Sequence, residues 1–191
     1  MNKAELRKVY KAKRAALSAA ERNKREDLAL IQFQKMDIVI PSVIMTYASS
    51  EAFQEFNPLL IEDYCYFINS DQQLCYPIVN QDAGIMLSMK VNDDTSFAKS
   101  KFGIDEPVDG ILIDPGQIEM ILVPLLCFDM RGYRVGYGKG YYDKFLANCY
   151  PSAMKVGLSF FDAEPGIDDI NEFDIPLDYC VTPDLVYHFK R

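Results

Sequence analysis

Short apolar segments alternate with segments of helical periodicity along most of the chain, and this alternation restricts the possible folds more than any other feature. The sequence predicts strands at 43–47, 73–77, 85–91, 120–124 and 155–159, with the last strand at 179–182. It predicts helices at 3–17, from residue 18 onward, at 57–65 and at 141–150. Such alternation is typical of a mostly parallel sheet with helices on both faces. We therefore expect an α/β fold.

Local signals support the helix assignments. Leu6, Tyr10 and Leu17 share one helical stripe, and Ser18 with Glu21 forms the sequence pattern of a capping box that opens a second helix. Pro58 suits the first turn of the helix at 57–65. We expect a long acidic surface loop at 161–176, and loops of this length often lie over a functional site. A loop that is disordered or has no functional role is the alternative.

Length and composition indicate one domain. The chain has 191 residues, of which 49% are hydrophobic, enough for one sizeable core but short for two complete domains. Residues 1–191 are therefore expected to form a single α/β domain, and we expect a monomer. The apolar run at 120–128 is too short to span a bilayer, and the five cysteines include no C-x-x-C pair. These features favour the cytoplasm, without membrane insertion or a disulfide framework.

The net charge of −8 argues against nucleic acid as a partner, because a phosphate backbone requires a broad positive surface. An anionic ligand would have to be bound locally. Basic residues are concentrated near the N-terminus, where they form either a local anion site or a solvated helix face. They are Lys3, Arg7, Lys8, Lys11, Lys13, Arg14, Arg22, Lys24 and Arg25.

A glycine-rich segment, 134–143, lies between the predicted strand at 120–124 and the predicted helix at 141–150. Gly136, Gly138 and Gly140 would let the oxygens of a ligand approach backbone N–H groups, and Arg134 and Lys139 supply positive charge. The helix that follows would add to the attraction for anions. The spacing matches neither the Walker A loop nor the dinucleotide-binding fingerprint. A turn that needs glycine only for its geometry is the alternative.

The segment 128–146 resembles the signature of the 5-formyltetrahydrofolate cyclo-ligase family, also called methenyltetrahydrofolate synthetases. Further matching motifs occur at 3–7, 17–22, 102–107 and 174–178, in the order of the family and over nearly the whole chain. The resemblance implies an α/β sheet between helices. It also implies the conversion of 5-formyltetrahydrofolate to 5,10-methenyltetrahydrofolate with ATP and magnesium. The expected partners are therefore a small folate and ATP.

The resemblance also implies roles for individual residues. Arg134 and Lys139 would act in catalysis by steadying the phosphates, and Asp143 with Asp178 would hold magnesium. The folate would contact Glu55, Tyr47 and Arg7. The ATP site would comprise Lys3, Arg7, Arg134, Gly136, Tyr137, Gly138, Lys139, Gly140, Tyr141 and Tyr142.

The implied reaction needs no side-chain nucleophile. ATP would phosphorylate the formyl oxygen, the folate N10 would attack the resulting imino-phosphate, and phosphate would leave as the ring closes. Catalysis would then depend on positioning and charge neutralisation. This agrees with a chain whose single histidine, His188, lies near its end and is expected at the surface.

The sequence departs from the family pattern at two positions and lacks tryptophan. Tyr137 stands where some members have arginine, and Phe173 stands where many have histidine. These changes affect substrate contacts rather than the reaction class. One alternative is a sugar-phosphate isomerase-like or acyl-transfer enzyme on a similar sheet. Another is a binding protein without activity, which would be expected to have lost Lys139 or Asp143.

Overall fold

The central element is a sheet of eight strands in the order β12-β11-β10-β7-β1-β2-β3-β6. The computed structural model describes residues 1–101 and 103–189, so Phe102 of the 102–107 motif lies outside the described residues. The strands are β1 (Val43–Met45), β2 (Gln73–Asn80), β3 (Ile85–Lys90), β6 (Ile111–Ile113), β7 (Met120–Pro124), β10 (Met154–Leu158), β11 (Tyr179–Val181) and β12 (Val186–His188).

The middle of the sheet is parallel and its edges are antiparallel. β1 pairs in parallel with β2 and β7, and β10 pairs in parallel with β7 and β11. The pairs β2–β3, β3–β6 and β11–β12 are antiparallel. The predicted mostly parallel α/β sheet is therefore confirmed. The expectation that 179–182 is the last strand is wrong, because a turn at Thr182 and Leu185 folds the chain back into β12, a strand too short to show a period.

The helices are α1 (Lys3–Ala15), α2 (Ala19–Gln34), α3 (Leu59–Ile68) and α4 (Tyr141–Leu146). The predicted capping box of Ser18 and Glu21 is present at the start of α2, and Asn2 with Glu5 forms a second one at the start of α1. α4 is shorter than the predicted helix at 141–150. After Leu146 the chain makes turn bonds, such as Cys149 N–H to Leu146 O at 3.2 Å, instead of continuing the helix.

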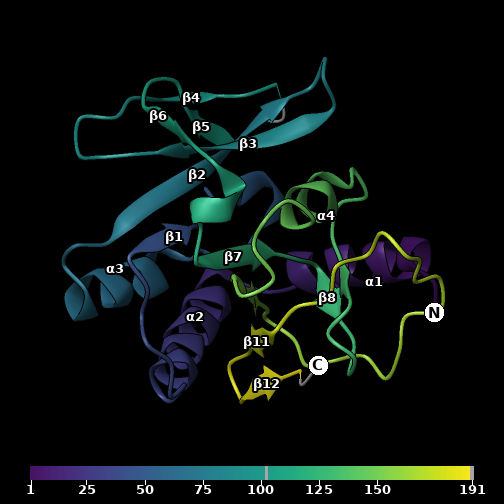
Figure 1. The fold of residues 1–191 in the computed structure, drawn as a ribbon. Helices are drawn as coiled ribbons and strands as arrows, with labels where there is room; N and C mark the ends of the chain where they lie inside the picture. The colour runs from purple at the N-terminus through teal and green to yellow at the C-terminus, as the bar shows by residue number, and fades with distance from the viewer. Residues whose placement is uncertain (102, 190–191) are drawn as a thin grey trace.

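The helices cover both faces of the sheet, as predicted. Phe33 of α2 and Ile61 of α3 pack with Leu122 of β7 in the core on one face. Phe145 of α4 packs with Val123 of β7 on the other face. Figure 1 shows α2 and α3 together on one side of the central strands and α4 on the opposite side. Successive side chains of β7 therefore belong to two apolar cores, one on each face of the sheet.

α1 packs beyond the sheet rather than on one of its faces. Its apolar stripe contacts a small two-stranded ribbon formed by β8 (Cys127–Phe128) and β9 (Arg134–Val135). This ribbon follows β7 and leads into the glycine-rich segment. The packing of α1 therefore brings the basic N-terminal helix next to that segment.

Several short elements were not predicted. β4 (Phe97–Lys99) and β5 (Asp105–Pro107) form a hairpin that contacts β2 and lies near β6 in Figure 1. Two 3₁₀ turns, η1 (Glu51–Phe53) and η2 (Pro115–Gln117), complete the order of elements. All are three residues long, too short for a periodic signal. Among the described residues, no helix has the length and apolar character required to cross a membrane.

Candidate active site

A cavity of about 510 Å³ opens at the carboxyl ends of the parallel strands, where α/β sheets commonly bind ligands. Pro124 ends β7 and Tyr47 follows β1, and both line this cavity. Its lining draws on α1, the turn after β1, strands β2 and β3, the β4–β5 hairpin and the segment 134–143. The lining residues are Lys3, Arg7, Lys11, Tyr47, Ala48, Phe53, Glu55, Pro77, Val79, Met86, Ile104, Glu106, Pro124, Arg134, Gly136, Tyr137, Gly138, Lys139, Gly140, Tyr141, Tyr142, Asp143 and Asp174.

The glycine-rich segment is held against α1. Arg7 donates from Nε to the carbonyl of Gly136 at 2.9 Å, and a Cβ on Gly138 would lie 3.1 Å from the Cζ of Arg7. Gly138 has a φ of +89° and Gly140 a φ of +71°, so both need the left-handed backbone region. Gly136 is not among the residues with positive φ. The backbone geometry therefore favours glycine at two of the three positions, and a Cβ at Gly138 would also crowd the guanidinium of Arg7.

One part of the cavity wall carries two ion pairs, and we call it the charged end. Arg134 lies 2.8 Å from Asp143 Oδ1 and donates to the carbonyl of Ile175 at 2.5 Å. The N–H of Ile175 donates to the same Asp143 oxygen at 3.1 Å. Lys3 pairs with Asp174 at 2.5 Å. Asp143 and Asp174 therefore lie on adjoining parts of the cavity wall, each paired with a cation from another segment.

The two acids proposed from the resemblance as magnesium ligands are not brought together. Asp143 lines the cavity, but Asp178 does not. Asp178 Oδ2 instead accepts the backbone N–H of Lys155 at 2.8 Å and lies 3.0 Å from its ammonium group. Asp174, at the start of the same 174–178 motif, lines the cavity in its place. The sequence motif contains both acids and does not show which one lines the cavity. The two differ because the chain between them turns around the buried Leu177.

Another part of the cavity wall is formed by tyrosines around one carboxylate, and we call it the aromatic end. Glu55 accepts the backbone N–H of Ser50 through Oε2 at 2.9 Å. Burial raises the pKa of Tyr142 and of Tyr137, and the negative charge of Glu55 raises both further. Tyr47 donates to the carbonyl of Phe56 at 2.8 Å. The hydroxyl of Tyr142 is buried without a hydrogen-bond partner among the described residues.

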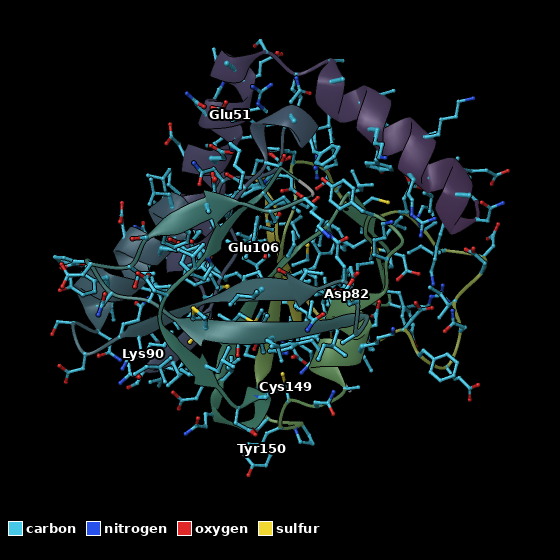
Figure 2. All side chains as sticks on the ribbon, turned by 90° about the horizontal axis from the view of Figure 1, so that it is seen from above. Glu51, Asp82, Lys90, Glu106, Cys149 and Tyr150 are labelled. Atoms are coloured by element: carbon cyan, nitrogen blue, oxygen red, sulfur yellow. The ribbon has the colours of Figure 1, made fainter. Side chains whose placement is uncertain are left out.

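Several residues at this site were not predicted as functional. Lys11 lines the cavity one helical turn beyond Arg7, a spacing that could have revealed it. Glu106 enters the cavity wall from the β4–β5 hairpin and accepts the N–H of Val79 at 3.3 Å. In the view of Figure 2, Glu106 is drawn near the centre, whereas Tyr150 is drawn at the edge. Arg14, only 4% exposed, donates to the hydroxyl of Tyr137 at 2.9 Å, and nothing in the sequence indicated this contact.

The acidic loop at 161–176 packs against the start of α1. The N-terminal amine lies 2.8 Å from Asp168, and the backbone N–H of Lys3 donates to Asp169 at 2.7 Å. The loop carries Asp174 into the cavity wall, whereas Phe173 is 74% exposed and does not line the cavity. The departure at Phe173 therefore lies outside the cavity wall, unlike the departure at Tyr137.

Known proteins resemble the chain over nearly its whole length. A 5-formyltetrahydrofolate cyclo-ligase of Mycoplasma pneumoniae is 28% identical over 183 residues, which cover 95% of this chain and 98% of that protein. The Escherichia coli K12 protein of the same name is 22% identical over 80% of this chain and 84% of its own length. The NMR structure of 5,10-methenyltetrahydrofolate synthetase from Aquifex aeolicus superposes with a TM-score of 0.79 at 27% identity, covering 100% of this chain and 94% of that one.

The match to the family as a whole agrees with these pairwise similarities and with the residues in the cavity. Residues 1–183 match the sequence model of the 5-formyltetrahydrofolate cyclo-ligase family. The matched range contains every residue that lines the cavity. The resemblance inferred from the motifs is confirmed, and the chain belongs to the 5-formyltetrahydrofolate cyclo-ligase family.

Proposed function

We propose that this protein converts 5-formyltetrahydrofolate to 5,10-methenyltetrahydrofolate and uses ATP and magnesium to do so, with release of ADP and phosphate. The observation that carries the proposal is the cavity itself. It gathers the residues expected for ATP and those expected for folate from segments that are far apart in the sequence. The charged end suits phosphates and the aromatic end suits a flat heterocycle.

The cations at the charged end would bind the ATP phosphates. Arg7 and Lys3 reach the cavity from α1, and Arg134 and Lys139 reach it from the glycine-rich segment. The left-handed glycines there leave backbone N–H groups without a neighbouring Cβ, which favours close approach of phosphate oxygens. Lys139 and Arg134 would neutralise the charge that develops during phosphoryl transfer.

Asp143 and Asp174 are the residues that would hold magnesium, in place of the expected pair with Asp178. Among the described residues no group of three or more histidines, cysteines or acids is placed to hold a metal ion. Magnesium does not need one, since it commonly uses one or two carboxylates, several waters and the phosphates of the substrate. Two carboxylates on one cavity wall fit that pattern. Bound there, the ion would neutralise phosphate charge.

The protein's own contribution to the chemistry is positioning. The formyl oxygen at N5 must face the terminal phosphate, so the folate has to lie with its pterin at the aromatic end and its formyl group toward the charged end. Glu55 would accept N–H groups of the pterin, and Tyr47 would lie beside the ring. After transfer of the phosphoryl group, attack of N10 on the activated carbon forms the new ring and expels phosphate. Holding these groups in contact would lower the entropic cost of both steps.

The test is the near-ultraviolet absorbance of the protein with 5-formyltetrahydrofolate, ATP and magnesium, because the methenyl product absorbs where the substrate does not. We expect an increase that requires all three components. An increase without ATP would contradict the proposed phosphorylation. No increase from folded protein would overturn the proposed activity and favour the isomerase-like, acyl-transfer or binding-only alternatives, which calorimetry with ATP alone would begin to separate.

A further inference from the structure

We propose that Arg14 and Tyr137 form a hydrogen-bonded relay that positions the carboxylate of Glu55 for the N–H groups of the pterin. Arg14 lies outside the cavity lining and would act through Tyr137, so it is a positioning residue. The inference rests on the proposed function, because it assumes that Glu55 meets the folate. It assigns a role to a buried arginine that the reaction itself does not use.

Both terminal nitrogens of Arg14 make hydrogen bonds, whereas its Nε is buried without a hydrogen-bond partner among the described residues. It lies in the last turn of α1, is 4% exposed, and donates to the carbonyl of Leu125 at 2.5 Å. Its other terminal nitrogen donates to the hydroxyl of Tyr137 at 2.9 Å and to the carbonyl of Phe53 at 3.4 Å. Arginine has no acceptor, so every bond that it makes points outward from the guanidinium. A buried cation held in this way requires a nearby negative charge.

The hydroxyl of Tyr137 lies between Arg14 and the carboxylate of Glu55 and connects the two. Its oxygen accepts from Arg14, so its own hydrogen is directed to another acceptor, and its hydroxyl interacts with the carboxylate of Glu55. The tyrosine ring packs against Phe53 with a centroid distance of 5.3 Å, and the Lys11 ammonium lies 5.7 Å from its centre. These contacts restrict rotation of the ring away from Glu55.

Glu55 is therefore held from two directions. The N–H of Ser50 donates to Oε2, and the hydroxyl of Tyr137 interacts with the same carboxylate. A carboxylate has about four acceptor positions, so it retains capacity for further donors. The neighbouring N–H groups on one edge of an aminopyrimidine ring are donors of the right kind. Fixing the carboxylate before the substrate arrives lowers the cost of ordering it on binding.

The same arrangement explains why a tyrosine suits position 137 in this chain. An arginine there would place a second cation against the buried guanidinium of Arg14. Two like charges in a partly buried site repel each other. The hydroxyl of a tyrosine instead accepts a hydrogen bond from Arg14 and can donate its own hydrogen to Glu55. The charge of Arg14 then stabilises the carboxylate of Glu55 through Tyr137.

The first test is Tyr137→Phe, which removes the hydroxyl and keeps the ring. We expect the KM for 5-formyltetrahydrofolate to rise about tenfold, as for the loss of a hydrogen bond to a charged group, and to rise more than the KM for ATP. The matched control is Tyr10→Phe. Tyr10 is a buried tyrosine of α1 that donates to the carboxylate of Glu164 at 2.5 Å, outside the cavity lining. An unchanged folate KM in Tyr137→Phe, or equal rises for folate and ATP, would overturn the relay.

The second test is a double-mutant cycle of Tyr137→Phe with Glu55→Gln, followed by calorimetric binding of 5-formyltetrahydrofolate. The relay predicts that Tyr137→Phe has little further effect once Glu55 is replaced, and additive effects would contradict it. Arg14→Lys should weaken folate binding less than Arg14→Gln. If Arg14→Gln fails to fold, the cycle at Tyr137 still decides the question. Absence of turnover in the wild type would count against the proposed function, whereas normal wild-type turnover with an unaffected Tyr137→Phe counts against the relay alone.

Discussion

The charged end and the aromatic end of the cavity organise charge in different ways. At the charged end, Lys3 pairs with Asp174 and Arg134 pairs with Asp143, so cations meet acids from distant segments inside the cavity wall. At the aromatic end, Glu55 lies among tyrosine hydroxyls, and the cation associated with it, Arg14, is buried behind Tyr137.

This difference separates two tasks. In the proposed function the ion pairs at the charged end would exchange partners, because phosphates would compete for the cations and a metal ion would compete for the acids. The aromatic end offers buried hydrogen bonds that are already in place. Changes at the charged end should therefore alter the rate and the use of ATP, whereas changes at the aromatic end should alter folate affinity.

The largest effect is expected for Lys139→Ala, at the charged end. Removing the cation that we propose neutralises charge in the transition state should lower kcat about 100-fold or more without unfolding the protein. Lys144→Ala is the matched control, because Lys144 in α4 donates to the carbonyl of Gly84 at 3.2 Å and lies outside the cavity lining. Steady-state kinetics and thermal unfolding would be measured together. A Lys139→Ala variant with wild-type kcat would remove this residue from the mechanism.

The next effect distinguishes Asp174 from Asp178. Asp174→Asn should raise the magnesium concentration needed for half-maximal activity about tenfold, since one proposed carboxylate ligand is lost. Asp178→Asn should leave the magnesium requirement unchanged. It should instead lower Tm, because it removes the partner of Lys155, which is only 4% exposed. Magnesium titrations of activity test both variants. The reverse pattern would restore the assignment to Asp178.

A smaller effect is expected for Arg7→Ala, which also removes the bond to the carbonyl of Gly136. The KM for ATP should rise about tenfold with a smaller change in kcat, and added salt should raise the wild-type KM for ATP as phosphate binding is screened. Lys8→Ala is the control, because Lys8 is the next residue of α1 and is exposed. An ATP KM that does not change in Arg7→Ala would separate α1 from nucleotide binding.

The smallest effect concerns Glu62, a buried acid of α3 outside the cavity, which contrasts with Glu55. Burial raises the pKa of Glu62, although hydrogen bonds from Thr46 and Tyr76 act in the opposite direction. The stability that a carboxyl with a raised pKa contributes is present at low pH and is lost as the pH rises above about 4.5 through the folded-state value. Glu62→Gln removes this titration, so the Tm of the variant relative to wild type should improve from acidic to neutral pH. A constant difference in Tm would contradict the raised pKa.

Much of this molecule follows from local patterns. Three features could be predicted from the sequence because each depends on neighbours within a few residues. They are the capping box at Ser18, the apolar run of β7 and the glycine-rich segment. The family signature added the residues expected for ATP and folate, and all of them line the cavity. The β4–β5 hairpin and β12 were missed because strands of three residues show no period.

By itself the sequence determined the α/β class, the order of the main elements and most of the residues that meet at the cavity, because these depend on periodicity, turn chemistry and a family signature. Only the tertiary structure decided which acid of the 174–178 motif reaches the cavity, since that depends on how the loop packs against α1. It also decided that Arg14 contacts Tyr137, which lies 123 residues further along the chain. Contacts between distant residues depend on packing across the whole fold, and no local pattern encodes them.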